Sequence, residues 1–184
     1  MDAKGPQADS PENEAPSCGS SAGIAGSIRN QKGFASLLQR WGLERGSQGL
    51  AEKSILILVD SSVWVDFFSA SPGRGGSELR RMIQESEPFA ITGVVVSEVL
   101  QGLTRDVATI ERLLGNCDML EPEGFDTYRH AAVMYRAARA KGLTLTTIDT
   151  LIAAIAVEHR AKVFTLDQDF SHIARLTALE LYRF

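Results

Sequence analysis

Two short, largely apolar runs, at 55–59 and at 162–166, stand out from the more polar segments around them. Both are rich in β-strand-forming residues and do not alternate between apolar and polar positions, which is typical of strands buried on both faces in a parallel sheet. Each run ends at an aspartate, Asp60 and Asp167. Because ligands of open α/β sheets bind beyond the carboxyl ends of the strands, the two carboxylates are candidates for one site.

From residue 54 onward, helical and strand patterns alternate along the chain. Short apolar runs predict two more strands, near 89–91 and 178–182. Strands that alternate with helices indicate an α/β fold, in which layers of helices enclose a mostly parallel sheet. Apolar residues at spacings of three and four predict helices at 62–69, 76–86, 93–103, 106–116, 123–141 and 147–160, with a short helix from Asp169.

The first 53 residues differ in composition from the rest of the chain. They hold half of the 16 glycines and half of the 6 prolines, with many serines, which predicts a poorly ordered extension at 1–53 before a domain at 54–184. Between Phe34 and Trp41, apolar residues at helical spacing predict about two turns of helix. Since an isolated helix of that length is marginal in water, it would form only when docked on the domain or on a partner.

Composition and charge restrict the class of protein. With 184 residues and 44% hydrophobic content, the chain can build one domain with a substantial core. Its net charge of −4, from 19 basic and 23 acidic residues, means that binding to RNA or DNA would depend on cations or on a local basic face. Cys18 and Cys117 form neither a disulfide framework nor a zinc pattern. No apolar run approaches the roughly 20 residues of a membrane span, so we expect a cytoplasmic protein without a membrane partner.

Several acidic residues are candidates for a shared site, but each also has an ordinary structural explanation. Asp60 and Asp149 stand where side chains cap helices, and Asp149 fits a capping-box pattern. Asp167 or Asp169 has the same position before the short helix that follows. Glu98 lies in a predicted helix and would be solvated in the simplest interpretation, although its apolar neighbours favour partial burial.

A common metal site explains these acidic residues together. Asp149 opens an almost wholly apolar helix that must pack on the sheet, so its carboxylate has to face something polar. Carboxylates about 6 Å apart repel by roughly 3 kcal/mol per pair at an effective dielectric near 20, and the cluster therefore needs a cation. Mg²⁺ and Mn²⁺ prefer carboxylate and water oxygens, whereas no His and Cys set for zinc is present. The most natural chemistry for such a site is hydrolysis of phosphodiester bonds.

Other nucleotide chemistries find no support in the sequence. The glycine-rich segment 72–76 lies between two predicted helices, and its spacing fits neither a Walker loop nor a dinucleotide fingerprint. No G-x-S-x-G elbow follows a strand. The segment Asp60-Ser61-Ser62 lacks the second aspartate of haloacid-dehalogenase-type phosphatases.

Four segments resemble, in order, the signature segments of PIN-domain ribonucleases of the VapC toxin type. They are LVDSSVWVDFF at 58–68, SEVLQG at 97–102, IDTLIAAIA at 148–156 and TLDQDF at 165–170. The resemblance implies a PIN-like three-layer α/β sandwich and a Mg²⁺- or Mn²⁺-dependent endoribonuclease, the toxin of a type II toxin–antitoxin pair. Members of that family leave a 5′-phosphate and a 3′-hydroxyl. The extension of about fifty residues departs from the family pattern, since such toxins usually begin almost at the first strand.

The resemblance also implies roles for individual residues and partners. The implied catalytic and metal-binding quartet is Asp60, Glu98, Asp149 and Asp167. Asp169 is expected to support this site, and Thr165 or Ser61 to form hydrogen bonds within it. Implied partners are an RNA substrate, a second copy of the chain in a homodimer, and an antitoxin with a segment that enters the active-site groove. Basic residues that are candidates for holding the RNA backbone, or else belong to solvated helix faces, are Arg74, Arg80, Arg81, Arg129, Arg136, Arg139 and Lys141.

Two other functions remain open at this point. One is a PIN-fold module that binds RNA or a protein partner without cutting, although the complete quartet argues against it. The other is a different Mg²⁺-dependent phosphodiesterase, such as a Toprim-like nuclease that uses a glutamate and the Asp167-x-Asp169 pair. That class would have glutamate rather than aspartate after the first strand.

Overall fold

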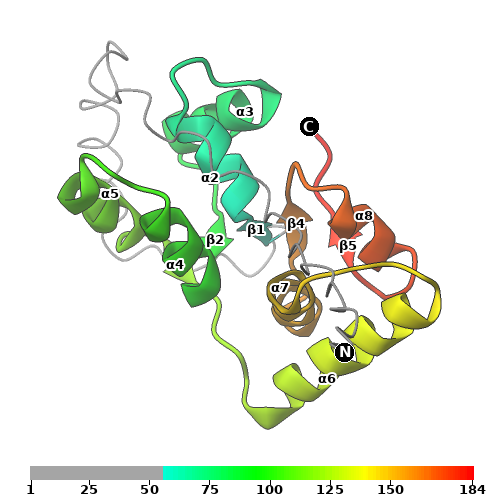
Figure 1. Cartoon of the computed structure of the whole chain (residues 1–184). Coiled ribbons are helices and arrows are strands. Elements are labelled where there is room, and N and C mark those ends of the chain that lie inside the picture. The colour runs from blue at the N-terminus through cyan, green and yellow to red at the C-terminus, as the bar shows by residue number, and fades with distance from the viewer. Residues whose placement is uncertain (1–55) are drawn as a thin grey trace, which may run out of the picture.

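The computed structural model describes residues 56–184 (Figure 1). The predicted extension at 1–53 with its helical stretch, Cys18, and the first residue of the predicted strand at 55–59 lie outside the described residues. Between 56 and 184 the chain forms five strands and seven helices: β1 (Ile57–Val59), α2 (Ser61–Phe68), α3 (Arg74–Gln84), β2 (Ala90–Ile91), α4 (Gly93–Gln101), α5 (Val107–Leu114), β3 (Asp118–Met119), α6 (Phe125–Ala140), α7 (Thr147–Glu158), β4 (Lys162–Phe164), α8 (Asp169–Ala174) and β5 (Glu180–Leu181).

The strands form one sheet in the order β3-β2-β1-β4-β5, and every neighbouring pair is parallel. The prediction of a mostly parallel sheet is confirmed. At the centre, Leu58 of β1 pairs with Ala90 of β2 on one side and with Val163 of β4 on the other. The chain thus leaves β1 toward one edge and later returns to build the other. Ligand sites of open α/β sheets form at such a switch point, beyond the carboxyl ends of the strands.

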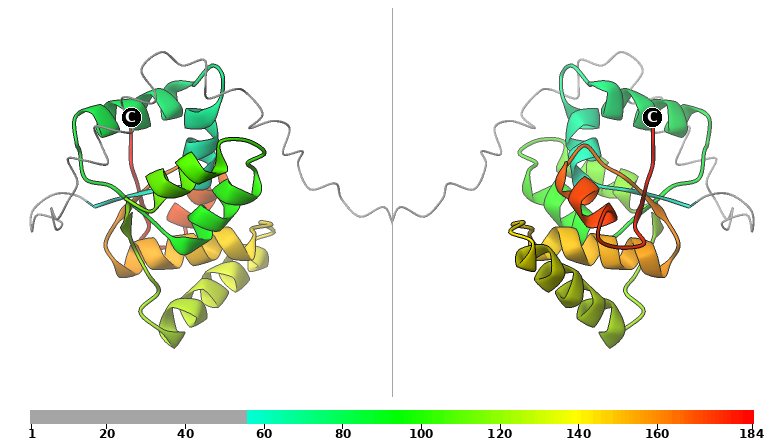
Figure 2. Two further views of the ribbon diagram at one scale, coloured as in Figure 1. Left: turned by 90° about the vertical axis from the view of Figure 1, so that its left-hand side faces the viewer. Right: turned by 90° about the vertical axis from the view of Figure 1, so that its right-hand side faces the viewer.

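Helices cover both faces of the sheet. The helices α2 to α5 lie on one side and α6 to α8 on the other (Figures 1 and 2). On the first side α2 contacts α3 and α4, and on the second α7 contacts α6 and α8. This division follows from the strand order, because right-handed crossovers toward opposite edges of a parallel sheet place their helices on opposite faces.

The core lies between the sheet and the two helical layers. Leu58 and Val59 of β1 are fully buried, and α2 adds the buried aromatic residues Trp64 and Phe67. The Trp64 and Phe67 rings meet edge to face with 5.7 Å between centroids, a favoured arrangement for aromatic pairs. In α7, Ile152 and its apolar neighbours are buried, as their composition predicted. Buried elements on both sides of β1 therefore fix the position of the residue that follows it.

The predicted helices are all present, with ends that differ by no more than two residues from the prediction. The strand β3 was not predicted, because its two residues, Asp118 and Met119, form no apolar run and are half-buried and exposed. The predicted strand at 162–166 was too long, since β4 ends at Phe164. Asp167 therefore follows a short loop, whereas Asp60 directly follows β1.

The helix α6 packs on α7 through small residues and leaves aromatic residues on the surface. Its buried positions are Thr127, Ala131 and Ala138, whereas Phe125 is 81% and Tyr128 52% exposed. The apolar spacing predicted the helix correctly, but these aromatic side chains do not serve the core. None of the helices within 56–184 is both long and apolar enough to span a bilayer.

Candidate active site

Asp60 is held at the carboxyl end of β1 by bonds from three elements. Its backbone N–H donates to the carbonyl of Phe164 in β4 at 2.9 Å. Its side chain caps α2 by accepting from the backbone N–H of Ser62 at 3.3 Å, as the simpler interpretation of this residue predicted. The hydroxyls of Ser62 and Thr165 donate to the same oxygen, Oδ2, at 2.6 and 2.9 Å. One carboxylate thus joins β1, α2 and the loop after β4.

Burial disfavours the negative charge of the Asp60 carboxylate. The residue is only 4% exposed, and this burial raises the pKa of its carboxyl above the usual value. The hydrogen bonds from Ser62 and Thr165 favour the charged form and oppose the effect of burial on the pKa. A nearby cation would stabilise the carboxylate further.

Glu98 brings a half-buried carboxylate toward the buried carboxylate of Asp60. It lies in α4, a helix capped by the buried hydroxyl of Thr92, which accepts from Val95 N–H at 3.3 Å. Partial burial raises the pKa of Glu98, a hydrogen bond with Ser61 opposes this, and the negative charges of Asp60 and Asp149 raise the pKa further. The predicted partial burial is confirmed.

Asp149 forms the predicted capping box at the start of α7. Its Oδ2 accepts from the backbone N–H and the hydroxyl of Thr146 at 2.9 and 2.6 Å, and its own N–H donates to the Thr146 hydroxyl at 3.0 Å. The side chain remains half-buried and close enough to Glu98 to affect its pKa. Capping and membership of the acidic cluster are therefore compatible for Asp149.

Asp167 and Asp169 complete the acidic surface from the loop after β4. Asp167 is exposed, and its Oδ1 accepts from the backbone N–H of Asp169 at 2.9 Å. Partial burial raises the pKa of Asp169, and the charges of Asp167 and Asp149 raise it further, while His172 at 3.7 Å opposes them. Neither aspartate is the residue at the N-cap of α8, which is Gln168.

The acidic cluster, defined as Asp60, Glu98, Asp149, Asp167 and Asp169, contains more negative charge than its surroundings neutralise. Within 56–184 the ion pairs involve Arg81, Arg129, Lys162 and His172, and of these only His172 contacts the cluster. In the same part of the chain no three His, Cys, Asp or Glu side chains converge closely enough to enclose a metal ion. The carboxylates nevertheless influence one another's pKa, and all-oxygen donors without compensating cations suit a hard divalent ion.

Ser62 is a site residue that sequence reasoning missed. Its hydroxyl donates to Asp60, accepts from the backbone N–H of Leu166 at 3.0 Å and lies 3.3 Å from the Thr165 hydroxyl. The other serine of this segment, the predicted Ser61, acts on Glu98, whose pKa it lowers against the effect of burial. A serine two positions after a capping aspartate was the available signal, because its N–H and hydroxyl both point toward the cap.

The predicted RNA-binding residues are scattered. Arg74 donates to the carbonyl oxygen of Phe184 at 2.5 Å, and Arg80 lies over the ring of Phe67 with 5.5 Å to its centroid. Arg129 pairs with Asp126 at 2.8 Å. Three further candidates, Arg136, Arg139 and Lys141, are exposed on and just after α6.

Arg136 is a predicted RNA-binding residue that lines a groove together with residues of α7. This groove of about 290 Å³ lies between α6 and α7 and is also lined by Tyr128 and Tyr135. From α7 the groove is lined by Thr147 and Thr150, on either side of Asp149 in sequence. This groove joins aromatic, polar and basic groups beside the first turn of the helix that carries Asp149.

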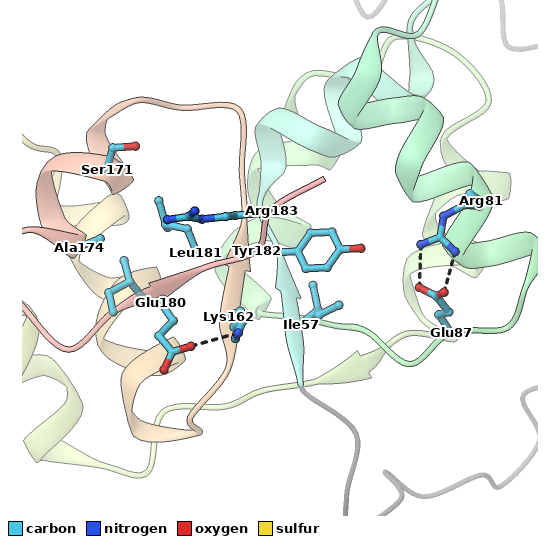
Figure 3. A pocket seen from close by; sticks show the side chains of 11 residues that line it. Ile57, Arg81, Glu87, Lys162, Ser171, Ala174, Glu180, Leu181, Tyr182 and Arg183 are labelled. Carbon is cyan, nitrogen blue, oxygen red and sulfur yellow. Dashed lines mark hydrogen bonds and ion pairs between the residues drawn. The ribbon is translucent and has the colours of Figure 1, made fainter.

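A second hollow lies at the amino ends of the strands, whereas Asp60 lies at the carboxyl end of β1. It measures about 910 Å³ and is lined by Ile57, Lys162 and Glu180, the first residues of β1, β4 and β5 (Figure 3). Arg81 also lines it and pairs there with Glu87 at 2.6 Å, besides its contacts with Glu78 and Glu85. The hollow contains no member of the acidic cluster, and it places Arg81 at the edge away from that cluster.

A parallel sheet with carboxylates gathered at its switch point defines the class of this protein as an α/β fold with an acidic site at the carboxyl ends of the strands. A family model for the PIN domain matches residues 57–176. VapC ribonuclease Mb1587 of Mycobacterium bovis and Ribonuclease VapC11 of Mycobacterium tuberculosis are each 38% identical over 133 residues, which cover 70% of this chain and 99% of the relative. The chain belongs to the PIN domain family, and the predicted resemblance to VapC-type ribonucleases is confirmed.

Solved structures support the same fold. VapBC2 from Rickettsia felis, bound to a DNA fragment from its promoter, matches with a TM-score of 0.56 and 17% identity, covering 71% of this chain and 99% of that chain. FitAcB from Neisseria gonorrhoeae matches with a TM-score of 0.52 and 19% identity, covering 69% and 96%. At such identities the likeness concerns the fold alone, and it confirms the PIN-like three-layer sandwich.

Proposed function

We propose that this protein is a metal-dependent endoribonuclease that acts as the toxin of a type II toxin–antitoxin pair. The acidic cluster at the switch point of the sheet is the observation that carries this proposal. Its relatives named VapC ribonucleases match over almost their whole length. The intact acidic cluster favours a protein that cleaves RNA over one that only binds it. A module that only binds RNA would not need several carboxylates that repel one another and the RNA phosphates.

Asp60 and Asp149 are the residues that would principally hold a divalent ion, and Glu98 and Asp167 would complete its surroundings. Mg²⁺ or Mn²⁺ fits this set because every side-chain donor is a carboxylate oxygen. The chemistry that such an ion supplies is activation of water for attack on phosphorus and stabilisation of the leaving oxygen. Asp169 would support the cluster from the start of α8.

The remaining residues of the site would orient these carboxylates. Thr165 and Ser62 both donate to one oxygen of Asp60, which fixes the plane of its carboxylate. Thr146 does the same for Asp149. Ser61 would favour the charged form of Glu98, since it lowers the pKa of that carboxyl. Carboxylates held in this way would need little rearrangement when substrate binds, which lowers the cost of reaching the reactive geometry.

RNA would approach along the groove between α6 and α7. Arg136 would pair with backbone phosphate, while Tyr128 and Tyr135 offer ring faces on which unpaired bases stack. Arg139 and Lys141 follow on the same helix and would extend the contact with phosphate. Since the net charge of the protein is −4, such local positive charge is where substrate attraction would arise.

Protein partners would include an antitoxin and a second copy of the chain. An arginine from an antitoxin would take the place of the metal by pairing with the carboxylates of the acidic cluster. The exposed side chains of Phe125 and Val133 on α6 offer an apolar surface for a homodimer. Because its substrate is RNA and its partner an antitoxin, we place the protein in the cytoplasm.

Cleavage of single-stranded RNA tests the function, with single-stranded DNA of the same sequence as the comparison. We expect RNA fragments that carry a 5′-phosphate and a 3′-hydroxyl, and no comparable cutting of DNA. Glu98→Gln should remove the activity, whereas Glu111→Gln, an exposed glutamate on the neighbouring α5, should retain it. Wild-type protein that binds RNA but leaves it intact under all divalent ions would favour the binding module. Equal cutting of DNA would favour another phosphodiesterase.

A further inference from the structure

One carboxylate holds the glycine-rich turn that connects α2 to α3. Asp66, near the end of α2, accepts from the backbone N–H of Gly73 at 2.8 Å and of Gly76 at 2.7 Å. Gly73 is the N-cap of α3 and has no side chain with which to cap the helix. Asp66 therefore satisfies two unpaired N–H groups of α3 from a neighbouring helix, and its charge faces the positive end of the α3 dipole.

Two glycines in the first turn of α3 pack closely on their surroundings. A Cβ atom on Gly76 would stand 2.7 Å from the Cα atom of Phe67, and one on Gly75 would stand 2.9 Å from Cδ2 of Leu166. The first contact is with backbone, so Gly76 has no room for a side chain, whereas a Cβ atom on residue 75 would have to displace the side chain of Leu166. Gly75 consequently lies directly against the side chain of Leu166.

Leu166 connects this turn to the acidic cluster. Its backbone N–H donates to the hydroxyl of Ser62 at 3.0 Å, and the same hydroxyl donates to Asp60 at 2.6 Å. Leu166 also immediately precedes Asp167. A displacement of Leu166 would therefore move two predicted catalytic carboxylates. It would act on Asp60 through the hydrogen bonds of Ser62 and on Asp167 through the backbone.

We propose that Asp66 is a positioning residue for the active site. By fixing the first turn of α3 against Leu166, it holds the loop that carries Asp167 and preserves the bond between Ser62 and Asp60. Leu166 depends on this support because its side chain is 44% exposed and the loop belongs to neither β4 nor α8. The inference rests on the proposed nuclease function of the acidic cluster.

Two variants test the contact from its two ends. Asp66→Asn keeps the shape but replaces one acceptor by a donor that faces a backbone N–H. Gly75→Ala leaves Asp66 in place and pushes Leu166 away. Each variant should remain folded and lose about ten- to a hundred-fold in kcat with little change in KM, since small misplacements of reacting groups have costs of this order. The double variant should lose less than the product of the two single effects, because both act through one contact. Gly93→Ala is the control, since its Cβ atom would meet nothing nearer than 3.9 Å.

A second readout needs no RNA and separates positioning from stability alone. The rise in melting temperature on addition of Mn²⁺ is measured for each variant, and the concentration that gives half of the rise is compared. A positioning role predicts a higher half-rise concentration in Asp66→Asn and Gly75→Ala than in wild type and Gly93→Ala. Asp66→Asn with wild-type kcat and Mn²⁺ half-rise concentration would overturn the inference. If Asp66→Asn does not fold, Gly75→Ala decides instead, and wild-type kcat and Mn²⁺ half-rise concentration in that variant would overturn the inference. Wild-type protein without RNA cleavage would refute the proposed function, and the Mn²⁺ comparison would still decide the role of Asp66.

Discussion

At the scale of single residues, Asp60 combines a structural and a chemical position. It caps α2 and joins β1 to the loop after β4, yet it is buried beside other carboxylates, which is unfavourable for its charge. A cap alone would be served equally well by asparagine, which ranks with aspartate at N-caps. Capping of α2 therefore does not explain why residue 60 is charged, whereas binding of a cation by its carboxylate does.

Substitution of Asp60 separates these two contributions. Asp60→Asn should reduce RNA cleavage by at least about a hundred-fold, because even partners that merely orient a metal ligand are worth about ten- to a hundred-fold. In chelator near pH 7, the same variant should have a higher free energy of unfolding than wild type. Urea denaturation measures the second effect, with Asp126→Asn as the control on exposed α6. An active Asp60→Asn protein would remove Asp60 from the site.

The pH dependence of wild-type stability in chelator follows from the raised pKa values. A carboxyl with a pKa above its unfolded value, which is 3.8 for Asp60 and 4.5 for Glu98, keeps its proton longer in the folded state. The folded state then binds more protons within that window, so the free energy of unfolding falls as pH rises from these values through the raised pKa values. Asp60→Asn should show a smaller fall. A fall that is no smaller in Asp60→Asn than in wild type would contradict the raised pKa of Asp60, because the lowered pKa values of Glu78 and Asp126 act in both proteins.

At the scale of elements, helix starts and strand ends build the site. The start of α2 carries Asp60 at its N-cap, α7 carries Asp149 in its capping box, and β4 leads into the loop with Asp167. Caps restrict the backbone and the side chain together, so they give short helices of eight and twelve residues well-defined starts. The site thus depends on local hydrogen bonds as well as on packing.

Removal of the Thr146 hydroxyl tests this dependence. Thr146→Ala should lower the free energy of unfolding by about 1 kcal/mol, the usual worth of an N-cap. RNA cleavage should fall as well, because Asp149 loses the hydroxyl that donates to it at 2.6 Å. Thr144→Ala, at an exposed position in the same loop, is the matched control. Equal stability and activity in the two variants would show that the capping box does not organise the site.

Particular elements show how far sequence alone leads. The apolar runs that became β1 and β4 and the apolar helix α7 were predictable, because burial on both sides demands such runs. The short strand β3 was not, since it depends on pairing with β2 rather than on its own residues. In the site, the acidic residues and two caps were foreseen, whereas the bonds of Ser62 and the Asp66 contact with α3 depend on distances between elements that are separate in sequence.

At the scale of the whole molecule, the buried apolar residues between 56 and 184 form one cluster around the sheet. The buried apolar cluster extends from Ile57 to Leu179, and the relatives match this chain over 133 residues that make up 99% of their own length. We propose that 54–184 is an independent domain and that 1–53 is an extension to it.

Deletion of residues 1–50 should therefore leave a folded and active protein. Its melting temperature should remain within a few degrees of the full chain, since a change of about 1 kcal/mol shifts a domain of this size by roughly 3 °C. RNA cleavage should be retained at the wild-type rate. A shortened protein that aggregates or melts much earlier would indicate that the segment around Phe34 to Trp41 packs on the domain.

The central claim is that the acidic cluster cleaves RNA only with a divalent ion, and a metal add-back assay on purified protein tests it most directly. Wild-type protein in excess EDTA should leave RNA intact, and Mg²⁺ or Mn²⁺ in excess of the chelator should restore cutting, with Ca²⁺ much less effective because its geometry is looser. Asp149→Asn should stay inactive at every concentration of these ions. Undiminished cleavage in EDTA, or full Mn²⁺-dependent cleavage by Asp149→Asn, would contradict the account.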